Sequence, residues 1–582
     1  MKRIVLALFF LSFLFGFNAQ ARTEVIRIGN QEQFDQLNKT VHKCIADGCK
    51  SITIRVSPGN YYFKERHLEL NDINAPGLTL KMVGKNAVLI AAGRDVSTDE
   101  PINGYNYTSS VVDIDKKEFV NMWGEMKYAD SDVEILNVEA KTCRLKSNGI
   151  KSRMADECRD AYIMITAWCR TYYYKITKIE DSYIYFDADN LKATRLYKMK
   201  GYNVNDDYLV YGKMPRYRIC NLDPVDRGTV HVSESQTFIN VNESSINRLS
   251  MKGFVFLGNK TKGDLEGVRY SLLVFNNVKT NRIRITNCQF IGQNSRVVSI
   301  NNTDNVQFDR NYISHNFRNG VTSYNSSSNT VVNDNVFDYN GESLSYERCI
   351  TCQGDNYHVF SNTFTDFGYS AISVGYYYGA TPVKNSGGVV EKNILTYSKE
   401  RMENIWKYTI VDGGAIYLWT RNEGAVIRNN VIYNYGGVDS NRGIYCDDGA
   451  KGFEIYGNIV LGVVNGYSID SRRAKEVDSR VGGANMNNKI YDNVFDGGFK
   501  FVAHEGESGC YKGRNFIIYD NNVQLPDLVV KNFDNPVEDE YVSFYGYKGS
   551  KIIIDKDAMK NIKQSKVGAK ASSFFVRIKG QN

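Results

Sequence analysis

Long apolar runs are scarce in this sequence of 582 residues. The clearest one follows Met1-Lys2-Arg3, extends from Ile4 to Phe17, and is followed by Ala19-Gln20-Ala21. That order of basic, apolar and small residues is typical of a secretory signal peptide. It predicts a signal over residues 1–21 and a secreted or periplasmic mature protein. No later segment has the roughly 18 uncharged apolar residues of a membrane span, so no membrane span is expected.

Proline and a dominant charge are also lacking. The chain has 8 prolines beside 48 glycines and 40 tyrosines, which argues against a helical bundle and indicates strands joined by Gly and Asn turns. There are 72 Lys and Arg and 65 Asp and Glu residues, and removing Lys2 and Arg3 with the signal leaves 72 − 2 − 65 = +5. Such a small excess predicts neither nucleic-acid nor membrane binding and leaves a weak preference for acidic polymers open.

The 11 cysteines are too few for a small disulfide-dense domain, and their odd number leaves at least one thiol unpaired. Sequence leaves the connectivity open among the candidate pairs Cys44 with Cys49 and Cys349 with Cys352, and the group Cys143, Cys158, Cys169 and Cys220. The Cys349-x-x-Cys352 motif has no second pair or His cluster at zinc spacing, so no metal is predicted there.

A short internal repeat dominates what is present. The template apolar-x-x-Asn-x-apolar occurs eight times, as FDRNYI, VNDNVF, VFSNTF, VEKNIL, IRNNVI, IYGNIV, IYDNVF and IYDNNV. ITNCQF adds a ninth unit with Cys288 in the Asn position. These positions are 288, 311, 335, 362, 393, 430, 458, 493 and 521, so successive units lie 23 to 37 residues apart. That period is too short for helical-pair repeats and suits one coil of a parallel β-solenoid.

In such a coil each strand pairs with its equivalent one turn later, about 4.8 Å away. The repeated Asn tolerates a left-handed backbone and suits the bend between two strands. We therefore expect stacked coils with an Asn ladder of structural role.

The repeat, together with DGGAIYLW (412–419) and GIYCDDGAKGFEIYGNIV (443–460), resembles the right-handed parallel β-helix superfamily of pectate-lyase-like, carbohydrate-active proteins. The resemblance implies an all-β fold. A predicted amphipathic helix over 31–46 precedes the strand ITIRV, in the pattern of a helix that caps the first coil.

The organisation expected from these features has five parts. Residues 1–21 form the signal, 22–107 the N-terminal cap and first coils, 108–235 an inserted β-rich module, 236–523 the parallel β-helix, and 524–582 a C-terminal cap or edge. The module lacks the Asn template, and YKITKIEDSYIYFDA predicts two strands that turn at Glu180-Asp181-Ser182. Its aromatic residues suit either a small core or stacking on sugar rings; these are Trp168, Tyr172, Tyr173 and Tyr174.

Strand alternation predicts which side chains face outward near the C-terminal coils. Aligning apolar positions puts Ile372, Ile416, Ile444 and Tyr467 in one inward column and Val374, Leu418, Cys446 and Ile469 in another. The column between them, predicted to face solvent, contains Ser373, Tyr417, Tyr445 and Ser468, and the next outward column contains Gly375, Trp419, Asp447 and Asp470. Adjacent coils would bring Asp447 and Asp470 within about 5 Å at the backbone. An aromatic and acidic groove is the prediction.

Paired carboxylates on a groove suit glycoside hydrolysis, in which one protonates the leaving oxygen and the other attacks the sugar or activates water. The pairing of DGGAIY with GIYCDDG is similar to glycoside hydrolase family 141, a family with fucosidase and xylanase activities. That resemblance implies catalytic roles for Asp412 and for either Asp447 or Asp448. Structural roles are the alternatives, as a turn residue for Asp412 and as a cap of a bend for Asp448.

A polysaccharide lyase is the second hypothesis. It needs cations to neutralise a uronate and a base to remove a proton. Candidate substrate contacts or bases on this face are Arg442, Lys407, Tyr417, Tyr445 and His504, while Asp447 and Asp470 could bind Ca²⁺. For Arg442 and His504 a plain turn and a plain loop are the alternatives. The third hypothesis is a non-catalytic carbohydrate-binding protein. The expected partner is a polysaccharide or oligosaccharide in every case, and no cofactor is predicted except Ca²⁺ for a lyase.

Overall fold

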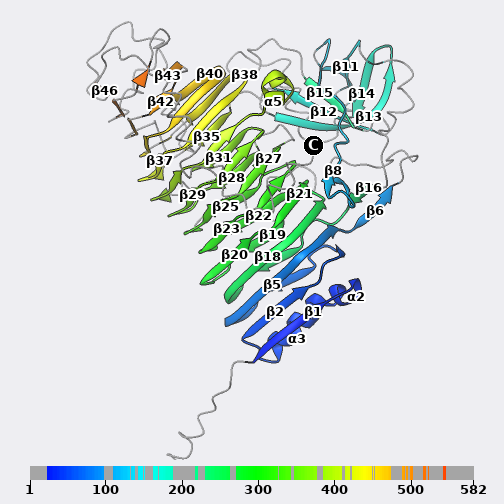
Figure 1. Cartoon of the computed structure of the whole chain (residues 1–582). Helices are drawn as coiled ribbons and strands as arrows, with labels where there is room; N and C mark the ends of the chain where they lie inside the picture. Colours follow the sequence, from blue (N-terminus) through cyan, green and yellow to red (C-terminus); the bar gives the residue numbers. More distant parts are fainter. Residues whose placement is uncertain are drawn as a thin grey trace, which may run out of the picture.

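The computed structural model describes residues 22–96, 109–131, 133–137, 142–148, 150, 161–167, 170–187, 216–220, 230–261, 271–324, 327–341, 347–375, 385–408, 413–419, 422–447, 450, 452–472, 488–491, 493–495, 498–502, 516–519, 522–523 and 542–545. Most of these residues belong to one large sheet whose strands pair in parallel with the equivalent strand of the next coil. This is a parallel β-helix, which confirms the predicted fold (Figure 1).

Each coil contributes strands to three faces, called here faces A, B and C. Four long strands bend from one face to the next: β5 and β18 pass from A to B, and β38 and β40 pass from B to C. Face A consists of β1 (Thr23–Ile28), β2 (Ser51–Val56), β5 (Asn74–Ala91), β18 (Ser245–Asn259), β20 (Arg282–Thr286), β23 (Val306–Asp309), β26 (Val331–Asn333), β29 (His358–Phe360), β33 (Val389–Glu391), β37 (Val426–Arg428), β39 (Glu454–Tyr456), β41 (Lys489–Tyr491), β44 (Phe516–Tyr519) and β46 (Val542–Tyr545).

The other two faces follow in order around each coil. Face B consists of β3 (Asn60–Phe63), the ends of β5 and β18, β21 (Gln289–Gln293), β24 (Tyr312–Ser314), β27 (Val336–Asp338), β30 (Thr363–Thr365), β34 (Ile394–Thr396), the starts of β38 (Val431–Cys446) and β40 (Ile459–Arg472), β42 (Val494–Phe495) and β45 (Asn522–Val523). Face C consists of β4 (Leu68–Asn71), β17 (Ile239–Asn242), β19 (Ser271–Asn276), β22 (Arg296–Asn301), β25 (Val321–Tyr324), β28 (Arg348–Cys352), β31 (Ser370–Val374), β35 (Gly414–Leu418), the ends of β38 and β40, and β43 (Gly498–Val502).

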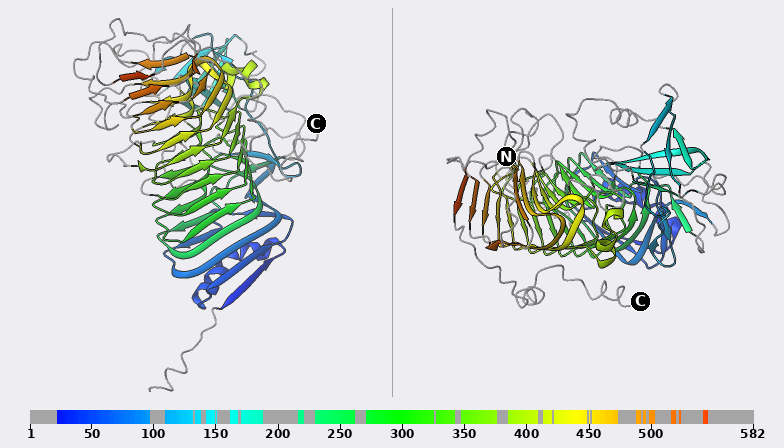
Figure 2. Two further views of the ribbon diagram at one scale, coloured as in Figure 1. Left: turned by 60° about the vertical axis from the view of Figure 1, so that its left-hand side comes forward. Right: turned by 90° about the horizontal axis from the view of Figure 1, so that it is seen from above.

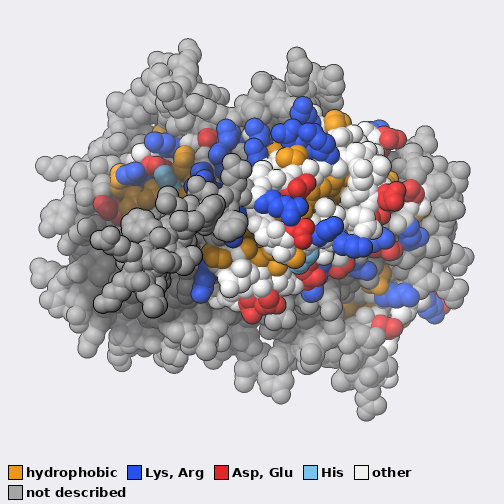
Figure 3. All heavy atoms as spheres, turned by 90° about the horizontal axis from the view of Figure 1, so that it is seen from below, with side chains coloured by type: hydrophobic (Ala, Val, Ile, Leu, Met, Phe, Trp, Pro, Cys, Tyr) orange, Lys and Arg blue, Asp and Glu red, His pale blue; other side chains and the backbone are white. Residues whose placement is uncertain are grey.

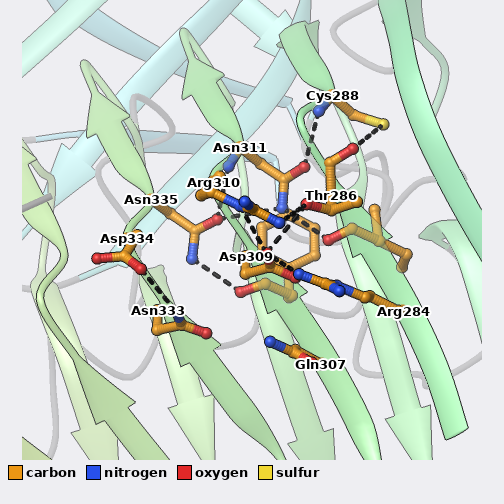
Figure 4. Close-up of polar contacts among 12 residues, drawn as sticks. Arg284, Thr286, Cys288, Gln307, Asp309, Arg310, Asn311, Asn333, Asp334 and Asn335 are labelled. Atoms are coloured by element: carbon orange, nitrogen blue, oxygen red, sulfur yellow. Dashed lines mark hydrogen bonds and ion pairs between the residues drawn. The ribbon is translucent and has the colours of Figure 1, made fainter. Parts of the chain in front are cut away.

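The repeated Asn lies at the bend between faces A and B, as predicted. The Nδ2 of Asn393 donates to Asn430 Oδ1 (2.9 Å) and to the carbonyl of Val359 (3.0 Å), and the backbone N–H of Asn393 donates to the same Asn430 Oδ1 (3.1 Å). The pattern recurs from coil to coil through Asn311, Asn335, Asn362, Asn393, Asn430, Asn458 and Asn493. Figure 4 shows its first members, where Cys288 takes the Asn position and its backbone N–H donates to Asn311 Oδ1 (2.9 Å).

The left-handed backbone expected at the repeated Asn occurs instead at the residue before it, from Asn311 to Asn458. The φ angles are 56° at Arg310, 56° at Ser361, 57° at Lys392, 55° at Asn429 and 64° at Gly457. An L side chain adopts this conformation at a cost that glycine avoids. Side chains of very different chemistry occupy this position before the ladder Asn. The bend therefore depends on the shared backbone geometry and on the ladder hydrogen bonds that follow it, and not on one type of side chain.

Two helices close the N-terminal end of the solenoid. They are α2 (Gln31–Asp35) and α3 (Leu37–Ala46), so the predicted helix over 31–46 is confirmed with a break at Gln36. Asn30 caps α2, because its side chain accepts from the backbone N–H of Gln33 (2.9 Å). The buried residues of α3 recur at helical spacing as Leu37, Val41 and Cys44, so one face of the helix covers the apolar interior of the first coil.

The inserted module leaves the solenoid after face B of the first coils and returns at β17. It forms a four-stranded sheet of β6 (Gly93–Val96), β16 (Val230–Ser233), β7 (Val111–Asp113) and β8 (Glu118–Phe119). A separate seven-stranded antiparallel sheet contains β9 (Lys127–Tyr128), β10 (Glu134–Asn137), β11 (Thr142–Lys146), β12 (Tyr162–Ala167), β13 (Arg170–Glu180), β14 (Tyr183–Asp187) and β15 (Arg216–Ile219). Figures 1 and 2 show this larger sheet beside the later coils rather than beside the coils from which it departs.

Several smaller expectations also have outcomes. The predicted turn is confirmed, because β13 and β14 pair from Glu180 and Tyr183, and Asp181 and Ser182 between them have positive φ. The eight described cysteines are buried free thiols, so none of the candidate bridges that involve only these residues is formed; they are Cys44, Cys49, Cys143, Cys220, Cys288, Cys349, Cys352 and Cys446. No helix among the described residues is long and apolar enough to cross a membrane. The signal over 1–21 lies outside the described residues.

Candidate functional site beneath the inserted sheet

Face C near its C-terminal end carries most of the predicted site residues. Ile372, Ile416, Ile444 and Ile469 form one inward column, all fully buried. The alignment of β31, β35 and β38 is as predicted, but that of β40 is wrong by two residues, because Ile444 pairs with Ile469 instead of Tyr467. Side chains alternate with a period of two, so a shift of two residues keeps the apolar pattern intact.

The corrected register separates the two aspartates that were predicted to be neighbours. Asp470 lies opposite Tyr445, whereas Asp447 follows Cys446 and stands in line with Trp419. The backbone N–H of Asp447 donates to the carbonyl of Leu418 (2.9 Å), which fixes its position. Asp447 and Asp470 therefore do not form the predicted column, and the side chain of Asp470 lies outside the described residues.

The tyrosines of the predicted solvent-facing column are buried, which corrects that prediction. Tyr417 is 1% and Tyr445 is 0% exposed, and Ser373 and Ser468 are likewise fully buried. The two tyrosine rings meet edge to face with centroids 5.0 Å apart. They point away from the solenoid interior but belong to an apolar cluster with residues of the seven-stranded sheet, including Ile163. The inserted sheet covers this part of face C. No pattern in the sequence around Tyr417 and Tyr445 predicts that another sheet buries them.

Contacts from both sides fix the inserted sheet on the coils. The ring of Trp123 lies 6.3 Å from that of Phe317, and Tyr128 stacks on Trp406 at 4.9 Å. Arg216 donates to the carbonyl of Trp406. Burial, with a further contribution from a neighbouring arginine, lowers the pKa of Arg216 to about 10.

Trp406 belongs to the short helix α6 (Ile405–Tyr408), which follows α5 (Lys399–Glu403). Lys407, one of the basic residues considered for a lyase, forms an ion pair with Glu125 (Nζ to Oε1, 2.7 Å). It therefore helps to attach the module.

Asp447 lies at the margin of this covered region and is 8% exposed. The hydroxyl of Tyr417 donates to Asp447 Oδ2. The carbonyl of Asp447 accepts from the N–H of Ala450 (2.9 Å), so the chain turns directly after the carboxylate. Trp419 is half-buried and packs against the same cluster, with its ring 6.0 Å from that of Tyr417. Trp419 and Asp447 thus lie close together, as predicted. They form the edge of a covered aromatic cluster, however, and not the wall of an open groove.

Two buried arginines approach the same tyrosines. Arg442, predicted as a substrate contact or a surface turn residue, is fully buried, and its Cζ lies 4.2 Å from the Tyr445 ring centroid. The Cζ of Arg348, which is 5% exposed, lies 5.9 Å from the Tyr417 ring centroid. Both distances suit cation–π contacts. The open, surface-turn alternative for Arg442 is excluded by its burial.

Arg348 is the residue that sequence reasoning missed. It begins β28 two residues before Ile350, as Arg442 stands two residues before Ile444, so extending the isoleucine column by one more coil would have found it. Between the two arginines the register places only Ser370 and Gly414. A Cβ at Gly414 would lie 2.8 Å from the Cβ of Tyr445, so a larger residue at this position would have to displace Tyr445.

Three predicted site residues lie outside the described residues: Asp412, Asp448 and His504. Gly413, the residue after Asp412, is held by two contacts. Its N–H donates to Asn441 Oδ1 (3.1 Å), and its backbone lies directly against the carbonyl of Tyr369. In the module, Tyr173 and Tyr174 are 9% and 2% exposed and belong to its core. Of the two interpretations for these tyrosines, the core is confirmed; Trp168 and the side chain of Tyr172 are outside the described residues.

The arrangement combines a carboxylate, a phenol that donates to it, aromatic faces and two guanidinium groups. A carboxylate and a hydroxyl can exchange protons with a bound substrate, aromatic rings can pack against sugar rings, and guanidinium groups bind carboxylates. Within the described ranges, no group of three or more His, Cys, Asp or Glu side chains could hold a metal ion.

Comparison with known proteins gives structural neighbours only. No family model and no curated protein matches the sequence. A solved structure titled glycoside hydrolase is 10% identical, with 94% of this chain and 99% of that chain covered and a TM-score of 0.47. The mannuronan C-5 epimerase A-module of Azotobacter vinelandii is 11% identical, with 84% and 90% covered and a TM-score of 0.30. A catalytic domain of a GH87 α-1,3-glucanase is 10% identical, with 78% and 90% covered and a TM-score of 0.24.

Proposed function

We propose that this protein is a carbohydrate-active enzyme, and that it is a glycoside hydrolase with Asp447 as one of its two catalytic carboxylates. The observation that carries the proposal is the hydrogen bond from Tyr417 to Asp447 at the margin of a covered aromatic cluster. Family 141 of the glycoside hydrolases remains the relative suggested by the sequence motifs. The expected substrate is a polysaccharide or oligosaccharide outside the cytoplasm, reached through a cleaved signal.

The roles of the carboxylates follow from what surrounds them. A hydroxyl that donates to a carboxylate favours its charged form, so Asp447 suits the nucleophile or the base. The acid that protonates the leaving oxygen is then Asp412 or Asp448, the flanking residues of the two sequence motifs. The half-buried Trp419 lies in line with Asp447 on the preceding coil, where its ring can pack against the sugar beside the scissile bond.

Substitution at Asp447 tests this proposal. Asp447→Asn should lower kcat by about 10² to 10⁴, because a positioned general base or nucleophile contributes that much. The measurement is the release of new reducing ends from a panel of plant, algal and bacterial polysaccharides. Tyr417→Phe should lower kcat by a smaller factor, because the carboxylate loses the hydroxyl that donates to it.

The chain supplies a matched control pair on another face. Tyr312 on β24 donates to Asp338 Oδ2 on β27 (3.4 Å), so it repeats the tyrosine–aspartate pairing away from the candidate site. Asp338→Asn and Tyr312→Phe should leave kcat within about twofold of the unmodified protein. Equal losses in both pairs would mean that Asp447 acts through stability alone, and an active Asp447→Asn protein would overturn the assignment.

A uronate lyase is the second candidate, and the two buried arginines favour it. Arg348 and Arg442 beside Tyr417 and Tyr445 could neutralise a uronate carboxylate while a tyrosine removes the neighbouring proton. A lyase releases unsaturated products with strong ultraviolet absorbance, whereas a hydrolase does not. Loss of activity in a chelator with recovery in Ca²⁺ would also favour the lyase. If no polysaccharide yields either product, the remaining hypothesis is non-catalytic carbohydrate binding.

A further inference from the structure

The first coils present a basic surface on face A, which we call the basic face. The register of β1, β2, β5, β18 and β20 aligns their outward positions in three columns. One basic residue each from β1, β2 and β5, and two each from β18 and β20, occupy these columns: Arg27, Arg55, Lys81, Arg248, Lys252, Arg282 and Arg284. The remaining outward positions hold Thr23, Val25, Ser51, Thr53, Thr79, Val83, Ser250 and Thr286, so none is acidic. Figure 3 views the molecule from this end and shows Lys and Arg side chains gathered on part of the described surface.

Most of these cations are exposed and form no ion pair within the part of the chain that the structure describes. Arg27, Arg55, Lys81, Arg248 and Lys252 are exposed. None of the five forms an ion pair with any of the residues that the structure describes. Like charges on neighbouring strands repel one another, so this arrangement lowers the stability of the isolated protein. A partner of opposite charge would remove that cost.

An ion-pair cluster marks the end of the basic face (Figure 4). Asp309 on β23 accepts two hydrogen bonds from Arg284, Nε to Oδ1 and Nη2 to Oδ2, both 2.8 Å, and one from Arg310 Nε (2.9 Å). Thr286 also donates to Asp309 Oδ2 (3.0 Å). The side chain of Asp309 is only 2% exposed. Asp309 therefore neutralises Arg284 and Arg310 within the protein, whereas the five exposed cations named above lie on β1, β2, β5 and β18.

We propose that the basic face binds an acidic polysaccharide that lies across the first coils. Adjacent coils repeat every 4.8 Å or so, a step comparable to one sugar residue of an extended chain, so successive cations can meet successive acidic groups. Between the cations lie threonine and serine hydroxyls, which can exchange hydrogen bonds with sugar hydroxyls. The face therefore offers both kinds of contact that such a polymer needs.

The same features disfavour nucleic acid as the partner. Single strands bind to aromatic side chains on which bases stack, and the outward positions of the basic face contain no aromatic residue. The major groove of a duplex takes a helix or a two-stranded ribbon, and a face of five in-register strands is too broad to enter it. The net charge of the whole chain is also small.

The basic face lies apart from the candidate active site. It belongs to face A of the first coils, whereas Asp447 and Tyr417 belong to face C of later coils. Binding there would hold the protein on an acidic matrix without occupying the site. The inference does not depend on which reaction the site performs, or on whether it performs any.

Binding of defined polymers tests the inference. We expect the purified protein to bind polygalacturonate, dextran sulfate or both, and not neutral dextran, in a pull-down or by fluorescence anisotropy. The first two probes distinguish carboxylate from sulfate as the recognised group. Binding should weaken as salt is raised from 0.05 to 0.5 M or so. The triple variant Arg55→Gln/Arg248→Gln/Lys252→Gln should bind about tenfold more weakly.

A second triple variant removes the same charge elsewhere. Lys64→Gln/Lys178→Gln/Lys399→Gln changes exposed lysines after β3, on β13 and in α5, and it should bind within about twofold of the unmodified protein. Equal weakening in both triple variants would assign binding to net charge and overturn the inference. So would binding of duplex DNA in preference to every polysaccharide, or no binding at all. This test measures binding, and both triple variants keep Asp447. A negative result here would therefore leave the proposed reaction unaffected, and loss of the proposed reaction would leave this inference unaffected.

Discussion

At the scale of single residues, two buried aspartates differ in what holds them. Asp309 is held by the charges of Arg284 and Arg310, and its role ends with that ion pair. Asp447 accepts from the neutral hydroxyl of Tyr417 at the margin of the covered cluster. A carboxylate matched by two guanidinium groups is committed to structure, whereas one that receives a neutral donor retains its negative charge for another partner.

Asp309 makes stability depend on pH. Burial raises its pKa, but the hydrogen bonds and charge of Arg284 outweigh this, and the pKa is lowered. A lowered folded-state pKa contributes stability that is fully present above the unfolded value of about 3.9 and is lost as the pH falls through the folded value. Asp309→Asn should therefore lower the free energy of unfolding by about 2 kcal/mol at pH 7.

Urea denaturation at several pH values measures this effect. The difference between Asp309→Asn and the unmodified protein should shrink as the pH is lowered from about 5 to about 2. A difference that stays constant over this range would show that the charge of Asp309 does not contribute.

At the scale of elements, the Asn ladder makes each bend depend on the next coil. Asn430 donates to the Val390 carbonyl of the preceding coil and accepts through its Oδ1 from Asn393 of that coil. Its backbone N–H and Nδ2 also donate to Asn458 Oδ1 of the next coil. Because the ladder residues are fully buried, water cannot replace a lost partner. The ladder thus couples neighbouring coils more strongly than strand pairing alone.

Removing one member should show this coupling. Asn430→Ala takes the acceptor from the backbone N–H and Nδ2 of Asn393 and leaves the carbonyl of Val390 without its donor. We expect a loss of about 3 kcal/mol in the free energy of unfolding, since each buried unsatisfied group costs about 1 to 3 kcal/mol.

The neighbouring residue provides the control. Asn429 is exposed with φ 55°, and Gly457 holds the equivalent position one coil later. Asn429→Gly should change the free energy of unfolding by less than about 1 kcal/mol. A cost at Asn429 equal to that at Asn430 would indicate that the bend conformation, and not the ladder, stabilises the coils.

Repetition from coil to coil determines which features of the fold and of the candidate site could be predicted from the sequence. The solenoid was predictable because the Asn position and the apolar alternation repeat in every coil, so many weak signals agree. The register of β40 was not, since pairing Ile444 with Tyr467 or with Ile469 satisfies the same alternation. The burial of Tyr417 and Tyr445 was also beyond reach, because it depends on a sheet that ends about 200 residues earlier in the chain.

At the scale of the whole molecule, the inserted sheet connects the start of the chain with its later coils. It departs after β6 and returns at β16, yet it packs on Phe317, Tyr369, Tyr417 and Tyr445. The candidate site is therefore completed by contacts between distant segments.

Weakening the contact between the inserted sheet and face C should disturb the candidate site at a smaller loss of stability than is needed to unfold the solenoid. Phe317→Ala removes a ring that lies 6.3 Å from Trp123 and 6.2 Å from Tyr173. We expect faster amide hydrogen exchange in β12, β13 and β35, and a loss of activity, because the sheet separates more often from face C. Exchange in β20 and β23 should be unchanged, and equal acceleration there would mean that the variant destabilises the whole solenoid.

The placement of the inserted sheet also sets the order of events during synthesis. Residues 109–220 emerge from the ribosome before the strands on which they dock, so docking on Tyr417 and Tyr445 can follow only after β35 and β38 have been made. Docking then closes a long loop, which is a slow step in folding. A chain that stops before β38 lacks Tyr445 and Asp447 and cannot complete the candidate site, so the proposed activity would report that the later coils have been made and stacked.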